Sequence, residues 1–428
     1  MNQLDRKVIP AIRKIERFNI IEAQKFGLDN GNTVYTINNG DQDILKVDLI
    51  FPAGNWYQTA PLVAFAANNQ MSDGTKAKSA SEIANIMDYY GAYTNFSVDK
   101  DNASVGILVL KKYVDQVMPL FHEVLTQPAF RESELEIFRN KHKQIFEIEQ
   151  TKVKNTARVK LSQLIFGNNH PYGYSVKKED FDFLSSARLN DFFNLTYKLP
   201  QAKIVLSGKI TNDDIGTINK FFGQGKKLDQ PESAKEFSTH PAADRICFIE
   251  KADAVQSAIR IGKIFPNKLD PDYTGLTVLN VILGGYFGSR LMKNIREEKG
   301  FTYGISSLLV SFIHSGYMAI TTEVGTNVTF EAVAEIYKEM KKLRTELVPR
   351  EELERVKNYM LGETVRMFDG PFAQADSFIS ILDYNLAYEY YYNFIYQLNR
   401  ITSDDILQLA QKHLKEEDFY QVVVGAPM

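Results

Sequence analysis

Apolar positions along the chain follow two spacings, and these predict strands and helices in turn. Two runs rich in β-branched residues, 44–51 and 103–110, show partial alternation and are predicted as strands. Apolar residues then recur at helical spacing, which predicts one helix ending before Pro128 and another ending before Pro349. These stripes contain Val114, Val117, Met118, Phe121, Val124 and Leu125 in the first helix and Val333, Ile336, Tyr337, Met340 and Leu343 in the second. We interpret both stripes as core faces, so each half of the chain is predicted to be α+β.

The pattern also occurs twice, in the same order. The recurring segments are IFP at 50 and 264, an NI-x-x-x-x-G segment at 85 and 294, the stretches 133–140 and 351–358, and apolar runs ending at Gly208 and Gly425. The separations are 214, 209, 218 and 217 residues, which favours a duplicated unit over coincidental matches of short apolar strings. We expect two homologous α+β domains, 1–222 and 245–428, each with a mixed or antiparallel sheet packed against helices.

Two further segments have a distinctive composition. Residues 223–244 are rich in Gly, Pro, Lys and Glu and poor in apolar residues, so they are predicted to link the two domains. The tyrosine-rich stretch 384–397 is predicted to pack as a helix against its neighbours, with an interface to a partner as the alternative.

Overall composition narrows the classes of function. The net charge of -3 argues against nucleic acid as the main partner, because phosphate binding needs a basic surface. No apolar run approaches the length of a membrane span, and no secretory signal is recognisable near the start. The single cysteine, Cys247, cannot form an internal disulfide and is predicted to be a small core residue rather than a reactive thiol. We expect a cytoplasmic protein.

The residues alone show no complete catalytic constellation. No two of the six histidines lie three to five positions apart, so no helix can present a histidine pair to a zinc ion. The chain also has no G-x-S-x-G, no P-loop and no dinucleotide-binding G-x-G-x-x-G after a strand.

The order of motifs in 61–98 resembles that of the pitrilysin/insulysin peptidases, which include the mitochondrial processing peptidases. Asp73-Gly74-Thr75, Ser81-Glu82-Ile83 and the turn at Gly91 stand where that family has corresponding residues. The resemblance extends over nearly the whole chain, from about residue 20, and implies two similar domains facing each other like a clam. Active members carry the zinc motif H-x-x-E-H on a helix.

Aligned from Gly74-Thr75, the zinc motif of this family is absent here. Its two histidines fall on Phe65 and Asn69, its glutamate on Asn68, and the third ligand at or near Gln144. A phenyl ring offers no ligand, side-chain amides are weak ligands, and an amide cannot act as general base near pH 7. The resemblance therefore implies a degenerate metal site, with no metal or other cofactor bound by this chain.

The second half retains a pair that the family uses at the substrate. The sequence from Ser289 to Tyr303 matches a family context in which an arginine and a tyrosine, here Arg296 and Tyr303, reach the peptide and the scissile carbonyl. A guanidinium and a phenol can hydrogen-bond peptide carbonyls and steady a developing oxyanion. The alternative is an ordinary salt-bridge arginine and a strand tyrosine. The equivalent positions of the first half, Met87 and Thr94, lack the pair.

The resemblance supports a hypothesis with two alternatives. In the leading one, this chain is a non-catalytic subunit that binds peptide and completes a zinc site on a partner, either a zinc-bearing relative in a heterodimer or a second copy in a homodimer. The first alternative is a structural or peptide-binding scaffold without catalytic contribution. The second is an unorthodox metallopeptidase.

Overall fold

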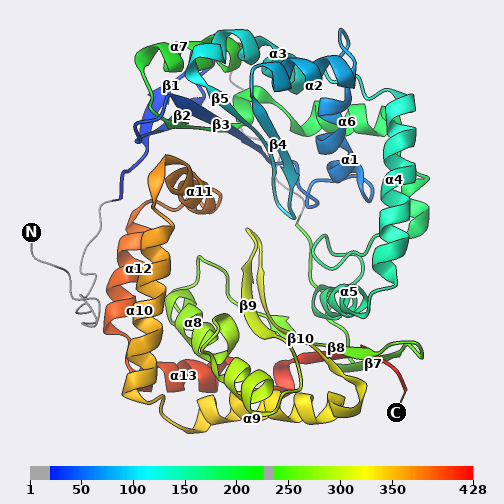
Figure 1. Cartoon of the computed structure of the whole chain (residues 1–428), viewed down its shortest axis with the longest axis vertical. Coiled ribbons are helices and arrows are strands. Elements are labelled where there is room, and N and C mark those ends of the chain that lie inside the picture. The colour runs from blue at the N-terminus through cyan, green and yellow to red at the C-terminus, as the bar shows by residue number, and fades with distance from the viewer. Residues whose placement is uncertain (1–19, 226–235, 428) are drawn as a thin grey trace, which may run out of the picture.

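Strands form at the predicted positions and pair into two separate sheets. The computed structural model describes residues 20–225 and 236–427 (Figure 1). Strands β3 and β5 occupy the two predicted runs and pair antiparallel along their whole length. The first sheet contains β1 (Gln24–Gly27), β2 (Thr33–Asn38), β3 (Ile44–Phe51), β4 (Tyr93–Val98), β5 (Ala103–Leu110) and β6 (Lys203–Gly208). The second contains β7 (Ile246–Glu250), β8 (Gln256–Ile264), β9 (Ile305–Ser311), β10 (Gly316–Gly325) and β11 (Tyr420–Gly425).

The two sheets share one topology, which confirms the predicted duplication and the fold class. The spatial order is β1-β2-β6-β3-β5-β4 in the first sheet and β7-β11-β8-β10-β9 in the second. In each, one parallel pair (β2 with β6, β7 with β11) is followed by antiparallel neighbours. The repeated segments lie on corresponding elements, for example Gly208 and Gly425 at the ends of β6 and β11. Only β1 lacks a counterpart among the described strands of the second sheet.

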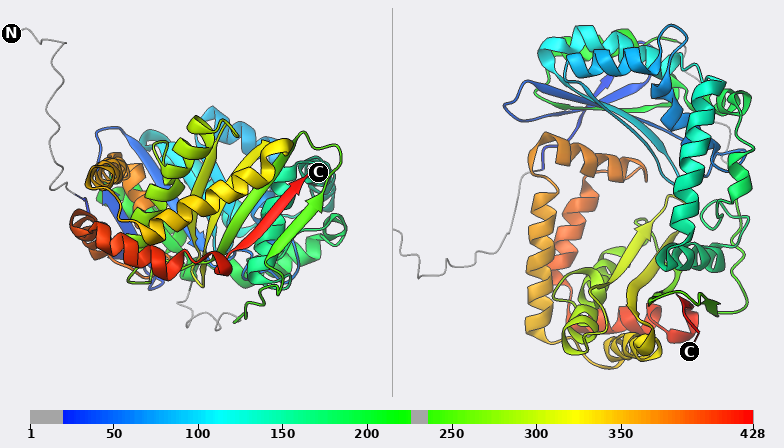
Figure 2. Two further views of the ribbon diagram at one scale, coloured as in Figure 1. Left: turned by 90° about the horizontal axis from the view of Figure 1, so that it is seen from below. Right: turned by 45° about the vertical axis from the view of Figure 1, so that its right-hand side comes forward.

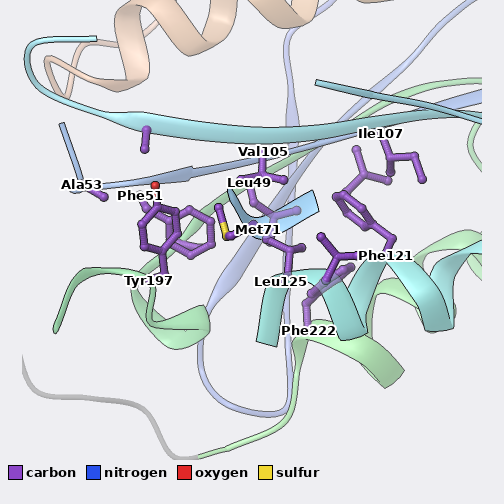
Figure 3. Close-up of a cluster of buried hydrophobic side chains, with 14 of the residues drawn as sticks. Leu49, Phe51, Ala53, Met71, Val105, Ile107, Phe121, Leu125, Tyr197 and Phe222 are labelled. Atoms are coloured by element: carbon purple, nitrogen blue, oxygen red, sulfur yellow. The ribbon is translucent and has the colours of Figure 1, made fainter. Parts of the chain in front are cut away.

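Helices cover both sheets and follow the same repeat. The two predicted stripes form α3 and α9, and their apolar residues are buried apart from the half-buried Tyr337. Figure 3 shows part of the first core, where Phe121 and Leu125 of α3 pack against Val105 and Ile107 of β5. The helices are α1 (Val63–Gln70), α2 (Ala80–Tyr89), α3 (Val114–Thr126), α4 (Glu132–Gln150), α5 (Val153–Phe166), α6 (Ser186–Thr196), α7 (Asn212–Phe222), α8 (Tyr273–Asn280), α9 (Thr329–Thr345), α10 (Arg350–Arg366), α11 (Gly370–Leu382), α12 (Glu389–Arg400) and α13 (Ser403–His413).

Each half contributes one helix to the sheet of the other half. Helix α5 lies on β8 and β11 of the second sheet, and its counterpart α11 lies on β6 and β2 of the first (Figures 1 and 2). Leu161 of α5 packs so closely that a methyl group on Gly262 would stand 3.1 Å from its Cδ2. Helix α11 is held by Phe378 in an apolar cluster and by ion pairs from Lys46 to Asp376 (2.8 Å) and from Lys203 to Asp383 (3.1 Å). The two halves are therefore interlocked.

An aromatic cluster also joins the halves. The indole of Trp56 stacks on His314, with ring centroids 3.9 Å apart. The buried hydroxyl of Tyr172 donates to Asp101 Oδ1 and accepts the backbone N–H of His314 (3.3 Å), while Asp101 Oδ2 accepts the backbone N–H of Ile313 (2.8 Å). A carboxylate of the first half thus binds the β9–β10 turn of the second half.

The segment predicted to link the domains has its middle, 226–235, outside the described residues. Residues 236–244 run along α5, where the backbone N–H groups of His240 and Ala242 donate to the backbone carbonyls of Phe166 and Leu164. In the tyrosine-rich stretch, Tyr388 and Tyr391 are buried in the cluster beneath α11, whereas Tyr396 is 61% exposed. No helix in the described ranges combines the length and apolar character that a membrane span requires.

Candidate functional site

Helix α1 carries the three positions predicted to replace the zinc motif. Asn68 is fully buried, and its Nδ2 donates to the hydroxyl of Tyr197 (3.2 Å) and to the carbonyl of Ser104 (3.5 Å). Asn69 is half-buried, and its Nδ2 donates to the backbone carbonyl of Phe65 one turn earlier (3.0 Å). Both amides therefore use their nitrogens within the fold.

The ring of Phe65 fills the space between α1 and α4. Its centroid lies 5.6 Å from that of Phe138 and 5.1 Å from that of His142, which meets it edge-on. Burial, and to a smaller extent the charge of Lys141, lowers the pKa of His142 and favours its neutral form. Gln144, the predicted third position, is exposed and lies on a different face of α4. The structure therefore brings His142, rather than Gln144, to Phe65.

The side chains at this position do not fit a zinc ion. Zinc sites use three or four imidazole, thiolate or carboxylate ligands, and the Phe65 position brings one imidazole, that of His142, against a phenyl ring. Within the described ranges, no group of three or more His, Cys, Asp or Glu side chains is arranged to hold a metal. The carbonyl oxygen of Asn68 is buried without a hydrogen-bond partner there, but the remaining surroundings are aromatic and amide groups.

A cavity of about 400 Å³ opens beside Phe65. Its apolar wall comes from α1, α4, α5 and the end of β4, and its polar wall includes two cations, Lys100 and Arg158. Its lining residues are Asn55, Gln58, Leu62, Phe65, Val98, Lys100, Phe146, Glu149, Gln150, Asn155, Arg158, Val159, Tyr174, Ser175 and Val176. The space next to the degenerate site is thus large enough to take a side chain of another molecule.

The structure brings Arg296 and Tyr303 together, but through the backbone. Arg296 Nε donates to the carbonyl oxygen of Tyr303 (3.0 Å), and the guanidinium lies 4.8 Å above the ring of Phe287. The Tyr303 side chain is 95% exposed. The backbone reaches this contact because Gly300 turns in the left-handed region (φ 66°), a conformation that glycine adopts without steric cost. Arg296 therefore fixes the loop that presents the Tyr303 phenol.

A polar pocket of about 340 Å³ borders Tyr303. It is lined by Gln256, Arg260, Thr302, Tyr303, Gly304, Ser306, Thr321, Thr322 and Glu323. Arg260 is buried there and donates from Nη1 to the carbonyls of Ile259 (2.9 Å) and Thr322 (3.1 Å). At the equivalent positions of the first half, Met87 is buried in the core and Thr94 lies on β4, so the exposed tyrosine belongs to one half only.

Two family models match these halves in order. The model described as Insulinase (Peptidase family M16) matches residues 33–178, and the model described as Peptidase M16 inactive domain matches residues 184–360. The chain belongs to peptidase family M16. This confirms the resemblance drawn from the motifs around Gly74 and Gly91.

Several proteins are similar in sequence to this M16 chain, and some are described as proteases and others as inactive. It is 24% identical to "Uncharacterized zinc protease YmxG" of Bacillus subtilis, over 79% of this chain and 83% of that protein. It is also 24% identical to "Non-peptidase homolog YmxG" of Helicobacter pylori, over 68% of each chain. A third relative, 19% identical over 57% of each chain, is "Probable inactive metalloprotease YmfF" of Bacillus subtilis.

Solved structures share the M16 fold of this chain. A peptidase M16 inactive domain from Pseudomonas fluorescens superposes with a TM-score of 0.82 at 24% identity, covering 95% of this chain and 98% of that one. A protease from Helicobacter pylori gives 0.83 at 16% identity, covering 96% and 100%. The periplasmic protease PqqL of Escherichia coli gives 0.78 at 14% identity, covering 95% of this chain and 46% of that one.

Three residues near the candidate site were not singled out from the sequence. His142 is one of them, although its spacing of four from Phe138 places both on one side of α4. Lys100 and Arg158 were not singled out, because 58 residues separate them and their shared cavity depends on how α5 crosses to the second sheet.

Proposed function

We propose that this chain is a non-catalytic subunit of an M16-type peptidase assembly, in which Arg296 and Tyr303 contribute to peptide binding at a zinc site on a partner subunit. The observation that carries the proposal is the contrast between two places in the chain. Phe65 and its neighbours do not fit a metal, whereas the Tyr303 phenol is exposed on a loop fixed by Arg296. This contrast supports a chain that contacts peptide without itself holding the metal.

The two residues have separate roles in the proposal. The Tyr303 hydroxyl has no intramolecular partner within the described ranges, so it is available to donate to a peptide carbonyl or a developing oxyanion. Arg296 Nε donates to the carbonyl oxygen of Tyr303, so the first role of Arg296 is to position Tyr303. Its side chain is 35% exposed. The phenol is the group expected to touch the peptide.

The test mixes the purified chain with a candidate H-x-x-E-H relative and follows peptide cleavage. Loss of one oxyanion-stabilising donor lowers turnover by about 10²-fold, so Tyr303→Phe is expected to approach that loss in the complex. Arg296→Ala is expected to lower turnover as well, because the loop loses its anchor. Unchanged turnover in both variants would refute the proposal.

A matched control is available on α12. Arg400 lies over the ring of the exposed Tyr396, 5.1 Å from its centroid, and thus forms an arginine–tyrosine pair outside the site. Tyr396→Phe and Arg400→Ala are expected to leave turnover unchanged. Size-exclusion chromatography with and without the relative decides between heterodimer and homodimer.

A second candidate function is a scaffold that makes no catalytic contribution. It is favoured by two relatives that are described as a non-peptidase homolog and a probable inactive metalloprotease. It predicts that the Arg296 and Tyr303 variants change no turnover, while the assembly still forms. An unorthodox metallopeptidase would instead retain near-stoichiometric zinc on metal analysis of the purified chain, lost on substituting Asn69.

The cytoplasmic location expected from the sequence is part of the same proposal. The structural relative PqqL is described as periplasmic, so relatives of this fold occur outside the cytoplasm. Cell fractionation followed by immunoblotting of the untagged protein distinguishes the two compartments.

A further inference from the structure

The cavity beside Phe65 contains two cations without anionic partners. Lys100 Nζ donates to one group, the carbonyl of Pro171 (3.2 Å), although an ammonium has three donors. Arg158 is exposed at the cavity and makes no side-chain hydrogen bond or ion pair with any described residue. Burial, with a further contribution from the charge of Arg158, lowers the pKa of Lys100 to about 8. The free donors of Lys100 and Arg158 indicate an excess of positive charge in the cavity.

The nearby acids do not neutralise this charge, because each is already engaged elsewhere. Asp101 is bound by the hydroxyl of Tyr172 and the backbone N–H of Ile313. Glu149, which lines the cavity, pairs with Lys152 and accepts from Asn155. An anion entering the cavity would therefore meet two charged donors that are not yet satisfied.

The rest of the lining is suited to a side chain with an apolar stem. Phe65, Phe146, Val98 and Val159 form an apolar wall opposite the polar residues. The buried Oε1 of Gln58 has no hydrogen-bond partner in the described structure, so it can accept an N–H from a ligand. A carboxylate on a short aliphatic chain matches this combination better than an inorganic anion, which has no apolar part.

The cavity also lies at the end of a free strand edge. Strand β4 is the edge strand of its sheet, its residues alternate between exposed and half-buried, and its last residue, Val98, lines the cavity. An extended peptide pairing with β4 would therefore reach Lys100 two residues further on.

We propose that the cavity between α1, α4 and α5 binds a carboxylate of an extended peptide, an Asp or Glu side chain or a C-terminus, with Lys100 and Arg158 as its counter-ions. The inference deepens the proposed function, because it takes the ligand to be a peptide and assigns its charge. It does not require a partner subunit.

The experiment measures binding of fluorescein-labelled extended peptides to the full chain by fluorescence anisotropy at low ionic strength. One pair of peptides differs only by Glu against Gln, and a second pair has a free or an amidated C-terminus. A hydrogen bond to a charged group can raise affinity by more than tenfold. The peptide with Glu, or the peptide with a free C-terminus, is therefore expected to bind about tenfold more tightly than its neutral counterpart. The preference is expected to shrink as salt is added.

Variants assign the effect to the two cations. Arg158→Gln and Lys100→Gln are each expected to reduce the preference, the double variant to remove it, and Arg158→Lys to retain most of it. Lys160→Gln, on the same helix but outside the cavity lining, is expected to bind like the wild type. Fluorescence of Trp56 checks that each variant is folded, and Arg158 is exposed, so its replacement leaves the core untouched.

Three outcomes would overturn the inference. These are equal affinity for acidic and neutral peptides, an equal loss in Lys160→Gln, and binding of inorganic phosphate through both cations without discrimination between the peptides. Failure of the proposed function is separate, since it appears as unchanged partner turnover in Tyr303→Phe while the acidic preference persists.

Discussion

Removing one hydroxyl group at the junction of the two halves is expected to weaken the whole fold. Tyr172 is 2% exposed, and its hydroxyl is one of two donors to the carboxylate of Asp101. Tyr172→Phe keeps the ring but leaves Asp101 Oδ1 without that donor and the N–H of His314 without its acceptor. A hydrogen bond to a charged group contributes about 1.5–3 kcal/mol, so the variant is expected to lose about 2 kcal/mol of unfolding free energy near neutral pH.

The loss should depend on pH in a defined direction. Burial raises the pKa of Asp101 above its ordinary value of 3.8, whereas the hydroxyl of Tyr172 and the N–H of Ile313 lower it. Without the hydroxyl this pKa rises further, so Asp101 takes up a proton more readily in the folded variant. The difference in stability between wild type and variant is therefore expected to shrink as pH falls towards the raised pKa.

The chain provides its own probe for this measurement. Trp56 is the single tryptophan, and its ring centroid lies 5.1 Å from that of Tyr172, so its fluorescence reports unfolding at the junction. Urea titrations at pH 7.5 and pH 5 give the two free energies. The matched control is Tyr317→Phe, in the same cluster, whose hydroxyl has no partner among the described residues. Equal losses in Tyr172→Phe and Tyr317→Phe would refute the reasoning.

Three further predictions concern other parts of the structure. Burial, with smaller contributions from nearby cations, lowers the pKa of His170 from 6.5 to about 4, so between these pH values the unfolded chain binds a proton that the folded chain does not. The free energy of unfolding is therefore expected to fall as pH drops from 6.5 to 4, and urea titrations of His170→Asn should show a smaller fall. Leu161→Ala, which opens a cavity where α5 meets the second sheet, is expected to cost about 2–5 kcal/mol and to unfold both halves in one calorimetric transition. The purified wild-type chain is expected to retain no stoichiometric zinc by mass spectrometry, whereas Phe65→His with Asn69→His should bind zinc in a way that His142→Ala abolishes, because His142 already contacts position 65.

The duplication could be predicted from sequence because the same order of short segments occurs twice in the chain. Strand β3 and strand β5 were predicted to the residue, since β-branched runs and their antiparallel pairing depend on local sequence. The recognition of the repeat predicted two similar α+β domains, which the two sheets of shared topology confirm. These features depend on the spacing of apolar residues, which the chain displays directly.

Other features depend on tertiary structure. Gln144 was assigned by counting from α1 past α2, β4, β5 and α3 into α4, and its role as the third ligand position stays a prediction. Two residues along a helix turn a side chain to the opposite face, so that Gln144 is exposed in the structure while His142 meets Phe65. An apolar stripe also does not say which sheet it covers, so the crossing of α5 and α11 was not foreseen. The family resemblance singled out Arg296 and Tyr303 as a pair, but it did not indicate that Arg296 would bind the backbone carbonyl of Tyr303.

The crossing of α11 has a consequence for synthesis on the ribosome. The last strand of the first sheet ends at Gly208, whereas the helix that covers its face ends at Leu382, 174 residues later. At a translation rate of about 5–20 residues per second, helix α11 is complete roughly 10–35 s after the strands of the first sheet. During this interval Ile37, Ile50 and Val205, which the finished fold buries beneath α11, face the surrounding medium. The nascent first half is therefore expected to expose this apolar face, and to be prone to association through it, until the second half has emerged.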